Sequence, residues 1–265
     1  MKILVISGIR SDYDILYPVL KELQENNHQV MIAVSGAHLS DQFSNTYTKI
    51  IGDGFEIVDK IDSLLSTDRV IQRAKGTGIL IQGLAQTIER TNPDILLVLG
   101  DREEAISTAI TGNYMNKLVV HIGGGDTVFG NADDPIRFAT SKLAHLHCCS
   151  AKFYADNLKK IGEEDFRIFF TGNPAYVNID TTPKISKKEL FNLLDLKCDN
   201  YIVLIKHPLS SELHKAETQM LKTINALKSF CEINGFQTIC IPPNSDPGSF
   251  EMKKVVEKMK NEDWL

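Results

Sequence analysis

The segment ILLVLGDREE, residues 95–104, decides the fold because it joins an unbroken apolar run to a glycine and a charged helix start. A strand that is apolar at nearly every position is covered on both faces, which is typical of a parallel sheet between two layers of helices. Helical patterns separate this run from the others, so the sequence predicts an α/β fold with a parallel sheet. The other strand-like runs of this part of the chain lie at 3–8, 30–35, 56–61, 118–122, 145–150 and 167–172.

The stretch GNPAYVNIDTTPK, residues 172–184, is rich in Gly, Asn and Pro and is typical of a linker. Strand and helix patterns then resume, with strand-like runs at 201–208 and 237–244. Two parallel strands bury too little surface to be stable alone, so the second domain is expected either to be incomplete or to depend heavily on the first. The predicted organisation is a Rossmann-like domain over 1–172, a linker over 173–185 and a partial Rossmann-like domain over 186–265.

The composition is that of an ordinary soluble protein, with 43% hydrophobic and 24% charged residues in a chain of 265. A net charge of -5 gives no basic excess, so a nucleic-acid partner is not expected. The five cysteines have no CxxC spacing, and we interpret them as reduced thiols. The N-terminal MKILVISG is interpreted as a first strand, not a signal peptide, and no apolar stretch reaches the length of a membrane span. A cytoplasmic protein without a membrane partner is therefore expected.

Charged side chains follow the predicted strands at the points where they end. In an open parallel sheet, ligands bind beyond these carboxyl ends. Taken singly, Asp12, Asp101 and Asp133 are as well explained as helix caps or first-turn acids. Together they predict a single site at the carboxyl edge of the sheet. In this site, carboxylates would transfer protons, and arginines and helix N-termini would hold an anion. The residues concerned are Arg10, Asp12, Asp14, Asp101, Arg102, Asp126, Asp133, Arg137, His207 and Asn244.

Other chemistries lack their sequence signatures. The loop SGIRSDYD is not the GxGxxG dinucleotide fingerprint, and neither a P-loop nor a GxSxG nucleophile elbow is present. No His/Cys spacing matches a zinc site. We therefore expect no metal and no organic cofactor.

Seven motifs, in order along the whole chain, resemble the hydrolysing UDP-N-acetylglucosamine 2-epimerases, and most closely the branch that supplies sialic-acid-type sugars. They are GxRxDYxxLxPVL from Gly8, GDRxE, HIxGGD, DDxIRxxxxKLAHLH, GNP, KHP and PPNSDxGS. The resemblance implies two Rossmann-like domains in the glycosyltransferase-B arrangement. It also implies conversion of UDP-N-acetylglucosamine and water to N-acetylmannosamine and UDP. The implied route eliminates UDP to a 2-acetamidoglucal, which is then hydrated with inversion at carbon 2.

The resemblance also implies roles for individual residues. Arg10, Asp14 and Arg102 match positions that hold UDP, His207 matches a histidine close to the diphosphate, and Asn244 matches a further nucleotide contact. Asp101 and Asp133 match carboxylates assigned to catalysis, a task that His207 is also expected to share. Arg137 is four residues beyond Asp133 on the same helical face, and we expect it to orient that carboxylate.

The sequence departs from the family pattern in two places. Many relatives carry glutamate at the position of Gly123, and Asp126 is the next carboxylate that can replace it. Family members also continue beyond Leu265 with further parts of the nucleotide pocket, so this chain is expected to be truncated, to bind UDP-sugar weakly and to be poorly active alone. Relatives are homo-oligomers, which implies a dimer or tetramer. A UDP-sugar-dependent glycosyltransferase and a non-catalytic nucleotide-sugar sensor are the alternatives.

Overall fold

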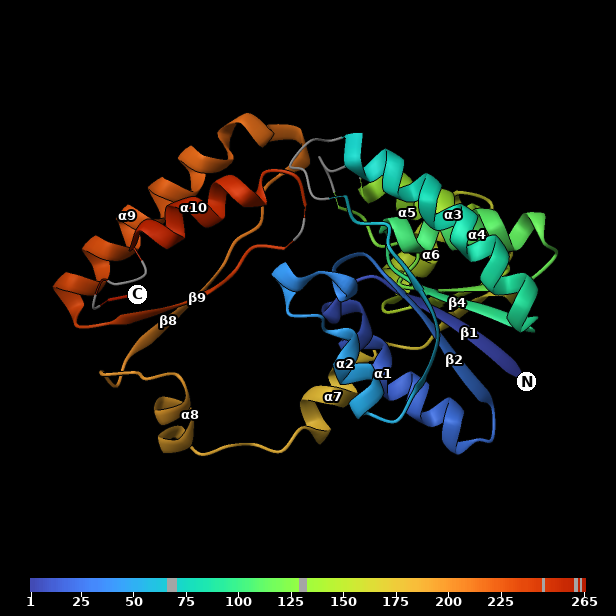
Figure 1. Cartoon of the computed structure of the whole chain (residues 1–265), viewed down its shortest axis with the longest axis horizontal. Coiled ribbons are helices and arrows are strands. Elements are labelled where there is room, and N and C mark those ends of the chain that lie inside the picture. Colours follow the sequence, from blue (N-terminus) through green and yellow to red (C-terminus); the bar gives the residue numbers. More distant parts are fainter. Residues whose placement is uncertain (66–70, 129–132, 245, 260–261, 263) are drawn as a thin grey trace. The chain divides into compact units, whose positions relative to one another are not determined.

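The chain divides into two compact units, Met1–Thr67 with Ile71–Thr182 (unit 1) and a second centred on Pro183–Leu265 (unit 2). The structure is a computed structural model that describes residues 1–65, 71–128, 133–244, 246–259, 262 and 264–265 (Figure 1). The division follows Thr182, inside the stretch that the sequence predicted as a linker.

Unit 1 is an α/β domain, as the sequence predicted. Within its described residues, seven parallel strands form one sheet in the order β3-β2-β1-β4-β5-β6-β7. The strands are β1 (Lys2–Ser7), β2 (Gln29–Ser35), β3 (Glu56–Ile61), β4 (Ile95–Leu99), β5 (Leu118–Ile122), β6 (Leu146–Cys149) and β7 (Ile168–Phe170). The helices are α1 (Arg10–Glu25), α2 (Tyr47–Gly52), α3 (Ile71–Thr91), α4 (Glu103–Tyr114), α5 (Asp133–Leu143), α6 (Lys152–Lys160) and α7 (Ala175–Thr181), with short 3-10 turns at Gly36–Leu39, Asp41–Phe43 and Asp165–Arg167.

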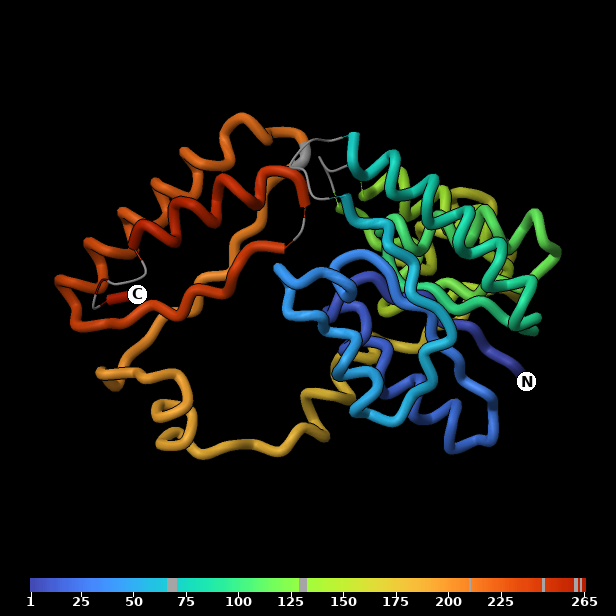
Figure 2. The backbone as a smooth tube through the Cα atoms, viewed as in Figure 1, coloured from blue at the N-terminus to red at the C-terminus, as the bar shows by residue number. Residues whose placement is uncertain are grey.

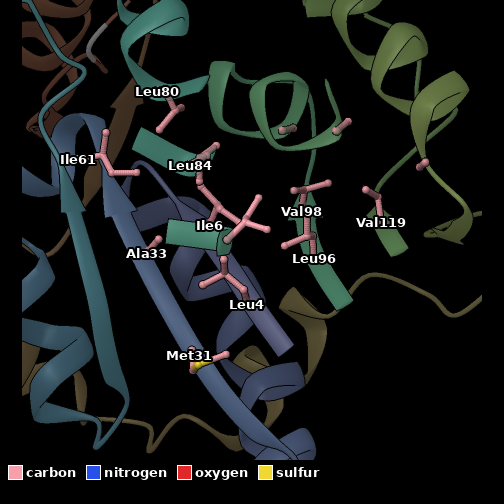
Figure 3. Packing of buried hydrophobic residues seen from close by; sticks show 14 residues of the cluster. Leu4, Ile6, Met31, Ala33, Ile61, Leu80, Leu84, Leu96, Val98 and Val119 are labelled. Carbon is pink, nitrogen blue, oxygen red and sulfur yellow. The ribbon is translucent and has the colours of Figure 1, made fainter. Parts of the chain in front are cut away.

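The sheet is buried on both faces because its central strands are apolar at consecutive positions. On β1, Leu4 and Ile6 belong to a core cluster with residues of α3 and α4, such as Leu84. Figure 3 shows Leu4, Ile6 and Leu84 meeting within this cluster. The alternate residues Ile3 and Val5 belong to a second cluster with residues of α1 and α2. Successive side chains of a strand point to opposite faces, so one apolar run supplies both layers.

The strand order reverses between β1 and β4, the two neighbours from which the sheet grows in opposite directions. Such a reversal is a topological switch point, where the loops that leave adjacent strands diverge and open a crevice at the carboxyl edge. The loop after β1 leads to Arg10, and the loop after β4 carries Gly100, Asp101 and Arg102. The fold therefore directs two of the predicted site segments to the place where doubly wound sheets bind ligands.

Residues 175–181, within the stretch predicted as a linker, form helix α7. This helix lies beside α1, as the trace in Figure 2 shows. The Asn178 side chain donates a hydrogen bond to the backbone carbonyl of Asp14 in α1. A helix of seven residues has too few positions to show a clear hydrophobic periodicity. The Gly, Asn and Pro content of the stretch therefore dominated the sequence pattern.

Unit 2 contains a small parallel sheet. Within its described residues, β8 (Tyr201–Ile205) pairs with β9 (Gln237–Ile241). Its core cluster joins Leu204 to residues of the two longer helices, and the alternate side chains of β8 are exposed. The helices are α8 (Lys187–Leu193), α9 (Ala216–Asn234) and α10 (Ser249–Met259), with a 3-10 segment at Ser210–Lys215.

Candidate active site

Arg137 brings two of the predicted catalytic carboxylates together. Its guanidinium forms a hydrogen-bonded ion pair with Asp101, which follows β4, and its Nη1 lies 3.6 Å from Oδ2 of Asp126, which follows β5. Nη1 also donates a 3.0 Å hydrogen bond to the carbonyl of Gly123. The Arg137 side chain is 11% exposed and that of Asp126 is 35% exposed, so the cation is buried beneath carboxylates that solvent can reach. This is an arrangement of paired acids on one fixed cation.

A second arginine connects the starts of three helices. Arg73 of α3 forms an ion pair with Glu103 of α4, and its Nη2 lies 3.6 Å from Oδ1 of Asp133 at the start of α5. Burial raises the pKa of Glu103, but the hydrogen bond from Arg73 and the charge of Arg102 outweigh it and hold that pKa below its usual range. Glu103 is therefore a carboxylate, suited to fixing Arg73 in place.

His121 in β5 supports the loop that carries Asp101. Its Nε2 lies 2.7 Å from the carbonyl of Gly100, and because a carbonyl only accepts, Nε2 carries the proton. Its Nδ1 then accepts, and it lies 3.1 Å from the Ser141 hydroxyl, whose single proton can go either to this nitrogen or to the Arg137 carbonyl 3.0 Å away. Burial lowers the pKa of His121 to about 4, so the imidazole is neutral near pH 7. His121 thus ties the backbone before Asp101 to the helix that carries Arg137.

Asp12 is an additional acid at the switch point. It lies in the first turn of α1 and is half-buried. Burial raises its pKa to about 7, the charge of Arg102 opposes that rise, and Glu104 and Asp101 add to it. A carboxyl group with this pKa exchanges its proton near neutral pH, which is what general acid–base chemistry requires.

Arg10 and Asp14 lie one turn apart on α1 and contact each other. Nε of Arg10 lies 3.2 Å from one oxygen of Asp14, and Nζ of Lys49 lies 2.5 Å from the other. The Arg10 side chain is 68% exposed. An exposed ion pair of this kind contributes little to stability, so both cations remain available to a ligand at modest cost.

In unit 2, His207 and Asn244 come together at the ends of the two strands. The backbone N–H of Asn244 donates a 3.1 Å hydrogen bond to Nδ1 of His207. The neutral imidazole therefore carries its proton on Nε2 and presents a donor there, a form assigned from this hydrogen bond. The Asn244 amide donates to Asp246 at 2.5 Å, and its oxygen accepts from Ser249 at 3.2 Å. This geometry favours an anion-holding role for His207 over proton abstraction.

The structure decides between capping and other roles for two acids. The N-cap residues of α1 and α4 are Ile9 and Arg102, so neither Asp12 nor Asp101 is a cap. Asp133 does lie in the first turn of its helix, as expected from the helix dipole. Arg137, expected to orient Asp133, binds Asp101 and Asp126 in the structure.

Sequence reasoning missed Arg73, His121 and Glu104. His121 is the first residue of the HIxGGD motif, but it stands in an apolar run, and the motif assigned no role to its side chain. In the described part of the chain, no group of three or more His, Cys, Asp or Glu side chains is placed to hold a metal ion. A search of the same residues finds no helix with the length and apolar character to cross a membrane.

The fold is that of solved UDP-N-acetylglucosamine 2-epimerases. One such enzyme, from Neisseria meningitidis and bound to UDP-GlcNAc, superimposes with a TM-score of 0.78 at 19% identity, over 98% of this chain and 70% of the other. The Methanocaldococcus jannaschii enzyme in complex with UDP-GlcNAc and UDP gives a TM-score of 0.79 at 17% identity, over 99% and 71%. These likenesses show that the chain has the fold of these enzymes.

The sequence matches carry the assignment further. Residues 21–264 match the family described as UDP-N-acetylglucosamine 2-epimerase, and the chain belongs to that family. A Legionella pneumophila relative named UDP-N,N'-diacetylbacillosamine 2-epimerase (hydrolyzing) is 33% identical over 97% of this chain and 67% of its own length. A Campylobacter jejuni relative named GDP/UDP-N,N'-diacetylbacillosamine 2-epimerase (hydrolyzing) is 33% identical over 86% of this chain and 60% of its own length. The chain thus spans roughly two thirds of the length of these relatives.

Proposed function

We propose that the chain carries the activity of a hydrolysing UDP-N-acetylglucosamine 2-epimerase. The substrate is UDP-N-acetylglucosamine or a related UDP-2-acetamido sugar, and the products are N-acetylmannosamine, or its analogue, and UDP. A base removes the proton from carbon 2, UDP leaves from carbon 1 to give a 2-acetamidoglucal, and water then adds with inverted configuration at carbon 2. The observation that carries the proposal is the sharing of Arg137 by Asp101 and Asp126 at the carboxyl edge of the sheet.

The elimination step and the hydration step each need chemical groups that the candidate residues can supply. Removal of the carbon-2 proton and the later return of a proton need two carboxyl groups, for which Asp101 and Asp126 are proposed, with Asp133 nearby on α5. Departure of the diphosphate needs fixed positive charge, for which Arg10 and Arg102 are proposed. In unit 2, His207 and Asn244 are proposed to hold the nucleotide, because Nε2 of the neutral imidazole is a donor.

The names of the relatives at 33% identity guide the choice of sugar. One is named for UDP-N,N'-diacetylbacillosamine and the other for GDP/UDP-N,N'-diacetylbacillosamine, nucleotide sugars whose sugar differs from N-acetylglucosamine. We therefore propose that turnover be compared on both UDP-sugars.

Incubation with each UDP-sugar in deuterated water, followed by NMR, tests the reaction. Free UDP together with deuterium at carbon 2 of a 2-epimerised sugar supports elimination and hydration. Release of UDP with hydrogen retained at carbon 2 points to simple hydrolysis or, when an acceptor is added and glycosylated, to the glycosyltransferase. Tight UDP binding without turnover points to the non-catalytic sensor.

Asp126→Asn tests whether Asp126 replaces the acid that relatives carry at the position of Gly123. We expect kcat to fall by about 100- to 10,000-fold, as is usual when a general acid or base is removed. Adding Gly123→Glu to that variant tests whether a carboxylate at this position restores part of the rate. Space is open, since no atom lies closer than 3.9 Å to a Cβ built at Gly123, but its φ of 78° should lower the unfolding free energy by about 1–3 kcal/mol, so the assay is run below the melting temperature of the double variant. Near-normal turnover of Asp126→Asn would remove Asp126 from the mechanism.

We also propose that the protein acts in the cytoplasm as a homodimer or homotetramer. Exposed aromatic side chains around β7, including Phe166 at 72% and Phe170 at 59% exposure, are typical of surfaces that bury against another molecule. Sedimentation velocity on the natural chain and on Phe170→Glu tests the oligomer, which the charge should weaken.

A further inference from the structure

The Glu104 carboxyl group lies next to the ends of two strands, β1 and β2, while its own helix follows a third, β4. Glu104 is the second residue of α4, immediately after the loop that follows β4, and it is 7% exposed. The hydroxyl of Ser35, the last residue of β2, donates a 2.9 Å hydrogen bond to its Oε1. The Ser35 residue is fully buried. The carboxyl group therefore links β2 to β4 below the surface of the crevice.

The second contact is with the glycine that follows β1. A Cβ built on Gly8 would lie 1.9 Å from Oε1 of Glu104, so the carboxyl group occupies the space that any larger residue at this position would need. A Cβ on Gly36, after β2, would lie 2.9 Å from the same oxygen. The backbone of Gly8 thus rests directly on the Glu104 carboxyl group, two residues before Arg10 and the start of α1.

The other carboxyl oxygen faces Arg102. Nε of Arg102 lies 3.8 Å from Oε2 of Glu104, and this oxygen is buried without a hydrogen-bond partner. Burial raises the pKa of Glu104, and the charge of Arg102 opposes that rise. A buried carboxyl oxygen without a hydrogen bond is costly, and the ion pair with Arg102 offsets part of that cost. Here it faces the Nε edge of the Arg102 guanidinium, which follows Asp101.

We propose that Glu104 is a positioning residue for the leaving diphosphate: it fixes both the Gly8 backbone and the Arg102 guanidinium on one buried carboxyl group. This inference rests on the proposed function, since it assumes that a UDP diphosphate occupies the loop after β1. Glu104 itself does not touch the substrate. It sets the relation between an arginine from the β4 loop and the backbone that opens α1, whose N–H groups are suited to an anion.

Glu104→Gln separates this role from a packing role. Glutamine has nearly the same shape and keeps an oxygen for Ser35, but it places an NH2 donor opposite the N–H of Arg102. Two facing donors repel, so the guanidinium should turn away. We expect UDP to bind about tenfold more weakly by calorimetry, a loss of about 1.4 kcal/mol. The KM for the UDP-sugar should rise by a similar factor, with kcat changed much less.

Glu163→Gln is the matched control. The Glu163 side chain is also fully buried, and it is paired with Lys142 at 2.6 Å and Arg167 at 3.0 Å behind β6. The Glu163→Gln substitution should lower the melting temperature of the protein without changing its affinity for UDP. Gly8→Ala gives a second approach if Glu104→Gln does not fold, because its methyl group must displace the same carboxyl group and should weaken UDP binding as well.

The outcomes separate the two proposals. If the natural chain binds UDP and both Glu104→Gln and Gly8→Ala bind it equally well, the positioning role is wrong and the proposed function stands. If Glu163→Gln weakens UDP binding as much as Glu104→Gln, the effect is one of general stability and the positioning role is again wrong. If the natural chain binds no UDP, the proposed function fails and this inference fails with it.

Discussion

Asp12→Asn provides a quantitative test of the electrostatics at the switch point. In the folded chain, burial raises the pKa of Asp12 from 3.8 to about 7. The unfolded chain keeps the ordinary value, so between these two pH values the unfolded state has released a proton that the folded state still holds. Stability therefore falls as the pH rises through this window and levels off above it. Asparagine cannot ionise, so the variant lacks this dependence.

The size of the effect follows from the shift. A rise of about three pKa units corresponds to roughly 4 kcal/mol, at about 1.4 kcal/mol for each unit. Asp12 is only half-buried, so water screens part of this, and we expect about 2 kcal/mol. Asp12→Asn should thus be more stable than the natural chain by about 2 kcal/mol at about pH 8, and by clearly less at about pH 5.

Urea unfolding of both proteins across this pH range measures the effect, with the difference in unfolding free energy plotted against pH. Ser11→Ala, an exposed neutral neighbour on the same helix, is the control and should show no pH-dependent difference. Subtracting the curve of the natural chain from that of Asp12→Asn removes the titration of the groups that both proteins share. His38, whose pKa burial lowers to about 4, is one of them. A difference that is constant with pH, or a natural chain that is the more stable at high pH, would refute the reasoning.

Three further predictions concern the core, a backbone contact and the shared cation. Leu84→Ala, at a fully buried position of α3, should lower the unfolding free energy by about 2–5 kcal/mol in urea titrations and leave UDP affinity unchanged. Gly125→Ala should lower the unfolding free energy by about 1–3 kcal/mol because of the φ of 79° alone. The loss should be larger still because the added Cβ would lie 2.2 Å from the Tyr154 carbonyl oxygen, and calorimetric unfolding measures it. Arg137→Lys should lower kcat about 100-fold in steady-state assays, because a single ammonium cannot hold Asp101 in the same geometry.

The sheet and its long helices could be predicted from sequence because their signals are local. The unbroken apolar run before Gly100 indicated a strand buried on both faces, and β4 is such a strand. The helix indicated by the charged residues after Gly100 is observed as Glu103–Tyr114, and the strand expected at 118–122 is observed over the same residues. Periodicity over many residues, with glycine at the strand ends, was sufficient for these elements.

The pairing of site residues could not be predicted because it depends on contacts between distant segments. The motifs placed Asp101 and Arg137 at strand and helix ends, but i,i+4 spacing on the helix suggested that Arg137 would serve Asp133. The structure pairs it across 36 positions with Asp101. Helix α2, of six residues, was missed for the same reason as α7, since so short a helix has almost no periodic signal.

The sharing of Arg137 bears on how one site performs two opposite proton transfers. In the proposed reaction, one carboxylate takes a proton from carbon 2, and a proton must later be returned during hydration. Two carboxylates on one guanidinium keep a nearly constant partner charge, because the one that remains ionised holds the cation while the other is protonated. The guanidinium is in turn fixed by the Gly123 carbonyl at 3.0 Å, so it does not follow the proton. A chemistry that needed only one proton transfer would not require this second acid, which is why Asp126, and not Asp101 alone, is the residue that most sharply separates the epimerase from the alternatives.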